Sequence, residues 1–157
     1  MQDKYKDSLE EFKKIISGCE VVILYKPLTN EISHKDALFH LKIPASNIFI
    51  PCDRNSDPFW WANKITTECK NRKTFILIPG RKFDICGTRH GNGGGWYDRF
   101  LSKVPRKWPR IGVCHSTQFS TKPLAQKPHD QPVDWIIVKS PEKLSYIKAS
   151  KFLSSPP

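Results

Sequence analysis

Short apolar runs alternate with amphipathic segments along the chain, and this alternation limits the folds it can adopt. Residues 21–25 form a continuous apolar run typical of a strand buried on both faces of a parallel sheet, and residues 74–78 are the strongest strand candidate. Such alternation predicts a single α/β domain whose open, mainly parallel sheet has helices on both faces. Further strands are expected at 47–50, ended by Pro51, at 110–114 and at 134–138. Helices are expected at 7–16, 33–41, 59–69, 96–104 and 142–153.

Composition narrows the class of protein. The 157 residues suit one domain, and no apolar run approaches the roughly 20 residues of a membrane helix. The charged N-terminal segment is unlike a signal peptide, so we expect a cytoplasmic protein. Five cysteines, odd in number and without C-x-x-C spacing, argue against a disulfide framework and a structural zinc site. They are expected to be small buried residues.

Charge points to the kind of partner. Lys and Arg number 26 against 15 acidic residues, which gives a net charge of +11. This surplus favours anionic partners such as nucleic acid, phosphates or polycarboxylates. The basic residues are not gathered in blocks, so a solvated basic surface stays an alternative.

A glycine cluster follows the strand expected at 74–78. Gly91, Gly93, Gly94 and Gly95 lie within five residues, between that strand and the helix expected at 96–104. Glycine lets backbone N–H groups approach a ligand closely, and such groups at a helix start can bind an anion. Known phosphate-loop patterns do not match, because the chain has no Gly-Lys pair and no third glycine for G-x-G-x-x-G. On glycine count alone, a flexible turn is an equal alternative.

The residues around the cluster carry a resemblance to a known family. Residues 79–101 read PGRKFDICGTRHGNGGGWYDRFL. This stretch resembles the signature of the 5-formyltetrahydrofolate cyclo-ligase family, roughly P-G-x-x-F-D-x-x-G-x-R-L-G-x-G-G-G-Y-Y-D-R-x-L. Upstream, residues 25–32 are similar to the family's Y-x-x-x-x-x-E-I segment. Downstream, Ile111-Gly112, Gln118, Pro128-His129-Asp130, Val133-Asp134 and Ile136-Ile137 follow in the family's order, so the likeness spans about residues 20–138.

The resemblance implies a NagB/RpiA-like three-layer fold and an ATP-dependent enzyme. That enzyme would convert 5-formyltetrahydrofolate into 5,10-methenyltetrahydrofolate and release ADP and phosphate. ATP would be the co-substrate, Mg²⁺ the cofactor and a reduced folate the other partner, with the protein acting as a monomer. The catalytic residues would be Arg89 and Glu31, and Mg²⁺ would be held by Asp98 and Asp130. Folate would contact Lys26, Glu31, Asn92 and Trp96. ATP would contact Arg89, His90, Gly91, Asn92, Gly93, Gly94, Gly95, Trp96 and Tyr97.

Each of these residues also has a simpler interpretation. Asp98 could be a favourable charge in the first turn of a helix. Asp130 could be a turn residue, Arg89 an exposed loop cation, Glu31 a solvated acid and Trp96 a core residue. His129 has no evident partner in the sequence and is given no role.

Two departures from the family pattern lower the catalytic activity that we expect. The family's N-terminal helix carries a Lys/Arg pair that reaches ATP, and no basic pair here lies in that register. The segment between Pro51 and Thr74 is also shorter than the family's. We therefore expect nucleotide binding with weak or absent turnover, unless Lys13, Lys14 or Lys26 supplies the charge.

Two other classes of function stay open. One is a relative that binds a nucleotide or folate without cyclising it. The other is a basic nucleic-acid-binding protein on the same scaffold. Residues 103–110 support this second alternative, because cations there surround one tryptophan that could stack on a base.

Overall fold

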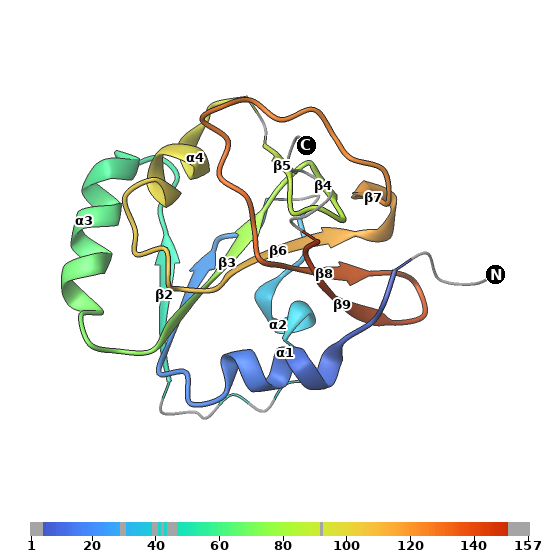
Figure 1. Cartoon of the computed structure of the whole chain (residues 1–157). Helices are drawn as coiled ribbons and strands as arrows, with labels where there is room; N and C mark the ends of the chain where they lie inside the picture. Colours follow the sequence, from blue (N-terminus) through green and yellow to red (C-terminus); the bar gives the residue numbers. More distant parts are fainter. Residues whose placement is uncertain are drawn as a thin grey trace.

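A six-stranded sheet forms the centre of the molecule, in the order β2-β1-β3-β6-β8-β9 (Figure 1). The computed structural model describes residues 5–28, 31–38, 41, 43, 47–91 and 93–150. Neighbouring strands run parallel except β9, which pairs antiparallel with β8. The strands are β1 (Val21–Tyr25), β2 (Ile48–Cys52), β3 (Thr74–Pro79), β6 (Arg110–His115), β8 (Trp135–Lys139) and β9 (Leu144–Lys148).

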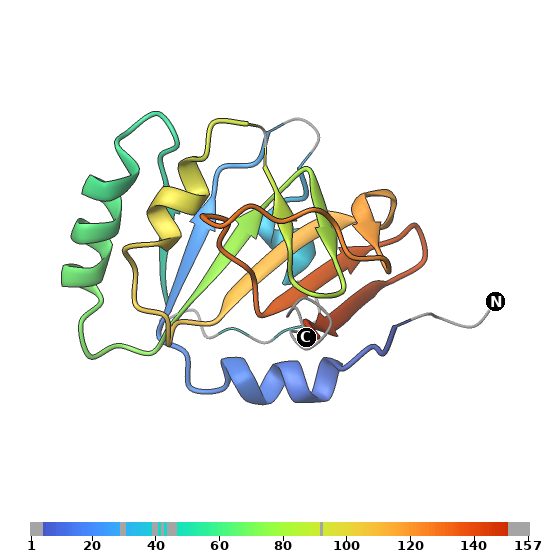
Figure 2. The ribbon, with the colours of Figure 1, turned by 45° about the horizontal axis from the view of Figure 1, so that its top comes forward.

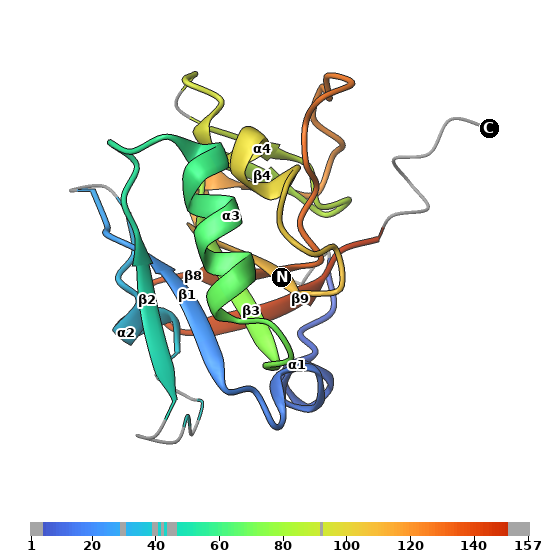
Figure 3. The same ribbon diagram turned by 90° about the vertical axis from the view of Figure 1, so that its left-hand side faces the viewer.

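Helices cover both faces of this sheet, as the sequence predicts. On one face, α1 (Leu9–Ile16) places Phe12 against Tyr146, with ring centroids 5.0 Å apart. The carbonyl of Ala37 in α2 (His34–Ala37) accepts a hydrogen bond from the hydroxyl of the same tyrosine. On the other face, α3 (Pro58–Glu68) and α4 (Trp96–Leu101) pack side by side (Figure 3). None of the described helices is long and apolar enough to span a membrane.

A second, smaller sheet lies over the main one and is absent from the sequence prediction (Figure 2). Its strands are β4 (Lys82–Asp84), β5 (Arg89–His90) and β7 (Phe119–Ser120). Phe83 packs on Gly112 of β6, where a Cβ atom would lie 2.4 Å from its ring. The buried carboxylate of Asp84 accepts hydrogen bonds from the N–H groups of Cys86, Thr88 and Leu124. These contacts fix the base of the glycine-rich loop.

The prediction of a helix at 142–153 is wrong. Residues 144–148 form β9, and residues 151–153 lie outside the described part of the chain. A turn in which the backbone N–H of Ser140 donates to the carbonyl of Lys143 folds the chain back on β8. Tyr146 and Ile147 are both buried there, and pairing along β8 outweighs the helical pattern of the segment.

Other boundaries also differ from the expectation: α1 begins at Leu9 instead of residue 7, and α4 ends at Leu101 instead of residue 104. Pro51 lies within β2 instead of ending it, because β2 is an edge strand and needs no N–H donor on its outer side. Of the helix expected at 33–41, the described helical residues are 34–37, with the Ser33 hydroxyl accepting from the N–H of Asp36. Strands β1 and β3 and helix α3 agree with the prediction within a residue.

Candidate functional site

The carboxyl ends of β1, β2 and β3 meet at one edge of the sheet, beneath the glycine-rich loop (Figures 1 and 2). From β1 the chain passes to β2 on one side and then crosses to β3 on the other. Ligands of open α/β sheets bind at such a reversal of strand order. A cavity of about 650 Å³ lies here. Its walls are Arg54, Arg81, Arg89, His90, Gly91, Gly93, Gly94, Gly95, Trp96, Tyr97, Asp98, Ala125, Gln126, Lys127 and Asp130.

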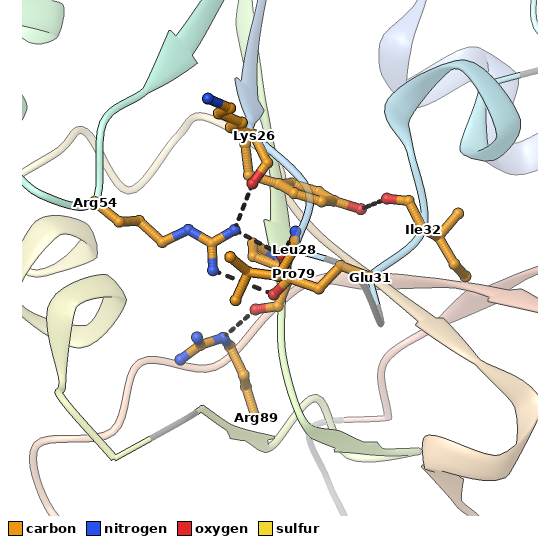
Figure 4. Close-up of polar contacts among 8 residues, drawn as sticks. Lys26, Leu28, Glu31, Ile32, Arg54, Pro79 and Arg89 are labelled. Carbon is orange, nitrogen blue, oxygen red and sulfur yellow. Dashed lines mark hydrogen bonds and ion pairs between the residues drawn. The ribbon is translucent and has the colours of Figure 1, made fainter.

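Arg89 is the most deeply buried cation of this cavity. Only 8% of its surface is exposed, and its Nε donates a 2.7 Å hydrogen bond to the carbonyl of Pro79 (Figure 4). Its guanidinium lies over the ring of Tyr97, 5.0 Å from the centroid. Burial lowers the pKa of Arg89 below its usual value, and the nearby charge of Asp98 opposes this. The interpretation of Arg89 as an exposed loop cation is therefore wrong.

Asp98 and Asp130 come together although 32 positions separate them in the sequence. With His129 they form a group whose potential ligand atoms all lie within 4.8 Å of one another. The N–H of Gln131 donates to Oδ1 of Asp98, and the N–H of Lys127 donates to Oδ2 of Asp130. Each carboxylate keeps an oxygen without a hydrogen bond from the described residues. His129, for which no role was expected, lies beside them with an exposed ring.

The aromatic residues at the start of α4 form a wall of the cavity. Trp96 is half-buried, stacks on Phe100 and donates from Nε1 to the carbonyl of Ser56 at 2.7 Å. Tyr97 is buried, and its hydroxyl has no hydrogen-bond partner among the described residues. His90 contacts the carbonyl of Ala125 through Nε2 at 2.6 Å. These contacts connect α4 to the segment just before α3, and β5 to the 121–130 segment, so that all of them surround the same cavity.

Glu31 lies beside the cavity but is not part of its lining. Arg54, at the carboxyl end of β2, binds its carboxylate at 2.6 Å and 3.2 Å through two nitrogens (Figure 4). The N–H of Leu28 donates to the same carboxylate, and Arg54 also donates to the carbonyl of Lys26. Lys26 therefore takes part in this network through its backbone carbonyl, and Lys26 as a whole is exposed. Asn92, the remaining expected contact, lies outside the described residues.

Comparison with known proteins agrees with this geometry. A sequence model of the 5-formyltetrahydrofolate cyclo-ligase family matches residues 60–139. The 5-formyltetrahydrofolate cyclo-ligase of Mycoplasma pneumoniae is 30% identical over 120 residues, which cover 75% of this chain and 72% of that protein. The chain belongs to the 5-formyltetrahydrofolate cyclo-ligase family. The Mycoplasma genitalium cyclo-ligase is 28% identical over 116 residues, or 73% of this chain and 69% of that protein.

Solved structures of cyclo-ligases share the fold. A 5,10-methenyltetrahydrofolate synthetase from Mycoplasma pneumoniae superposes with a TM-score of 0.56 at 22% identity, over 81% of this chain and 79% of that one. The synthetase from Aquifex aeolicus gives a TM-score of 0.50 at 26% identity, over 91% and 77% of the two chains. The family's α/β architecture, expected from the glycine signature, is confirmed.

Sequence reasoning missed three cations of this cyclo-ligase cavity. Arg54, Arg81 and Lys127 line it together with Arg89. Arg54 and Arg81 follow the ends of β2 and β3, so a correct end for β2 would have placed Arg54 at the ligand-binding edge. Lys13 and Lys14, two candidates to supply this charge, belong to α1 at the opposite end of the sheet (Figure 2). Lys26, the third candidate, is not among the lining residues, but its carbonyl accepts a hydrogen bond from Arg54.

The basic segment 103–110 is built into the cyclo-ligase scaffold. Trp108 is buried and cannot stack a base, and Arg106 pairs with Asp134 at 2.9 Å. Arg110 is also buried and donates to the carbonyl of Leu101. Trp108 and Arg110 therefore contribute to packing at the start of β6, whereas Lys103 and Lys107 are exposed.

Proposed function

We propose that this chain catalyses the ATP-dependent cyclisation of 5-formyltetrahydrofolate to 5,10-methenyltetrahydrofolate. The formyl oxygen attacks the γ-phosphorus of ATP and ADP leaves. N10 of the folate then attacks the activated carbon and loses its proton. The C–O bond breaks, so the formyl oxygen departs in inorganic phosphate.

One observation carries the proposal: a buried arginine, a glycine-rich loop and a pair of carboxylates line the same cavity at the carboxyl edge of the sheet. Phosphoryl transfer depends on positioning and charge neutralisation more than on covalent chemistry by the protein. A family signature that places these groups together matches the needs of that reaction.

In this proposal Arg89 neutralises charge on the ATP phosphates. Its bond to Pro79 and its contact with Tyr97 hold the guanidinium before ligand arrives, so little reorganisation is needed. The N–H groups of Gly93, Gly94 and Gly95 have no hydrogen-bond partner among the described residues and remain open to phosphate oxygens. Trp96 and Tyr97 supply the apolar wall against which a ring of either substrate packs.

Asp98 and Asp130 fit a magnesium ion. Mg²⁺ prefers oxygen ligands and is commonly held by one or two carboxylates together with substrate phosphates. Each residue has a carboxylate oxygen that accepts no hydrogen bond from the described residues, and both residues line the cavity. When bound, the ion supplies positive charge that balances the phosphates. The backbone N–H groups of Gln131 and Lys127 orient the two carboxylates for this role.

The proposal is tested by incubating the protein with 5-formyltetrahydrofolate and MgATP. We expect the absorbance of the methenyl product to rise, with one ADP and one phosphate formed per product. Arg89→Ala is the matched loss-of-function variant, and a denaturation curve checks its fold. MgATP binding without any methenyl product would support the non-catalytic alternative instead.

A further inference from the structure

Arg54, rather than Glu31, faces the proposed ligand. Arg54 lines the cavity, and 22% of its side chain is exposed. Glu31 is not part of the lining, and only 7% of its side chain is exposed. In Figure 4 the Glu31 carboxylate lies against the guanidinium of Arg54. An incoming ligand in the cavity therefore meets the arginine first.

The contacts around Arg54 hold its guanidinium in one position. Two nitrogens bind the Glu31 carboxylate, and one of them also donates to the carbonyl of Lys26 at 2.8 Å. Glu31 is itself fixed, because the N–H of Leu28 donates to it at 2.9 Å. A planar guanidinium that is bound along one edge is pre-organised, so less conformational entropy is lost when it contacts a ligand.

Arg54 also lies beside Arg89. Both guanidinium groups contact the ring of Tyr97, at 5.8 Å and 5.0 Å from its centroid. Two like charges around one buried ring repel each other, and the nearby carboxylates of Glu31 and Asp98 offset part of this positive charge. An anion placed between the two arginines would remove the remaining imbalance.

We propose that Arg54 is a binding residue for the phosphate groups of ATP, and that Glu31 is a positioning residue which acts through Arg54. The inference rests on the proposed function. It gives Glu31 a role different from direct contact with the folate. It also supplies, from the end of β2, positive charge that α1 does not bring to the cavity.

The test is a double-mutant cycle on Arg54→Ala and Glu31→Gln, read as the dissociation constant of MgATP by calorimetry. Losing Arg54 should weaken MgATP binding roughly tenfold to a hundredfold, the range for a lost charge-assisted contact. Glu31→Gln alone should weaken it less, and the double variant should bind no worse than Arg54→Ala. Arg54→Lys should restore little, because an ammonium cannot reproduce the fork.

The matched control is Arg72→Ala. Arg72 precedes the amino end of β3, whereas the cavity lies at the carboxyl ends of the strands. It should leave MgATP binding unchanged. Circular dichroism and thermal unfolding establish that each variant is folded.

Three results would overturn the inference while wild-type turnover stands. One is a full effect of Glu31→Gln in the Arg54→Ala background, which would show that Glu31 contacts ligand directly. Another is Arg54→Ala changing only the KM for folate. The last is equal MgATP affinity in Arg54→Ala and wild type. Wild-type protein that neither binds MgATP nor forms product would instead overturn the proposed function, and this inference with it.

Discussion

Gly91 lies so close to Arg89 that a Cβ atom on the glycine would be 2.9 Å from Nη2 and 3.1 Å from Nη1 of the guanidinium. Its φ is not positive, unlike those of Gly93 and Gly95, so the need for glycine at this position is one of space. Gly91 directly follows β5, which contains Arg89, and the absence of a side chain on the glycine leaves room for the guanidinium of the arginine.

Gly91→Ala should therefore displace the guanidinium of Arg89 and weaken MgATP binding by about tenfold, the cost of one charge-assisted contact. The control is Gly94→Ala, because a Cβ atom there meets nothing within 4 Å and its φ is not positive. Titration calorimetry measures both. Equal effects of the two substitutions would show that loop flexibility, not space beside Arg89, controls binding.

Asp98→Asn and Asp130→Asn should each weaken nucleotide binding more in the presence of Mg²⁺ than in EDTA, because each removes a carboxylate charge from the proposed metal site. His129→Ala should have a smaller effect, since imidazole is a poor ligand for this ion and the ring is exposed. Asp36→Asn, on α2, is the control for loss of one acidic residue. A similar loss with and without Mg²⁺ would argue against metal binding.

Gly112→Ala should destabilise the fold by about 1–3 kcal/mol, the usual cost of overpacking a core. Its Cβ atom would lie 2.4 Å from the buried ring of Phe83, which joins the small sheet to β6. Urea unfolding measures the difference. A double variant with Phe83→Leu should recover part of it, whereas no recovery would place the strain elsewhere.

Stability should fall in alkaline solution because of two buried thiols. Burial raises the pKa of Cys52 and that of Cys114 from 9.0 to about 12. At a pH between 9.0 and about 12, these two thiols are deprotonated in the unfolded chain and still protonated in the folded protein. The free energy of unfolding therefore decreases as pH rises, by up to about 1.4 kcal/mol per pH unit for each thiol, while this stabilisation is complete below pH 9.

Urea unfolding at two pH values on either side of 9 checks this expectation. Cys114→Ala should show a shallower decrease than wild type, and Gly94→Ala should show the same decrease. An unchanged slope in Cys114→Ala would assign the alkaline loss to other groups, such as Tyr146, whose pKa burial raises to about 12.

The parallel core of the fold was predictable because its signal is local. β1 is an uninterrupted apolar run, β3 is apolar apart from Thr74, and every residue of both strands is buried. The segment 144–148 misled the prediction because its partner, β8, lies across a turn that propensity alone does not reveal. The small sheet was missed for a similar reason: β5 and β7 have two residues each, and long-range pairing with β4 defines them.

The candidate site was predictable where the signature is contiguous, from Arg89 to Asp98. The meeting of Asp98 with Asp130 was expected from the resemblance, and the structure brings these residues together. Arg54 was missed because β2 was expected to end at Pro51, whereas the strand runs to Cys52 and leads directly to Arg54. Its importance comes from the side-by-side ends of β1 and β2, which bring it to Glu31, 23 positions away.

Pro51 in β2 has a consequence for how copies of this chain can associate. A free sheet edge offers backbone donors and acceptors to strands of other molecules, and so invites aggregation. Proline lacks the N–H that such a ladder requires, so a foreign strand laid along β2 would meet a gap. Pro51 thereby disfavours pairing of a second copy of the chain along β2.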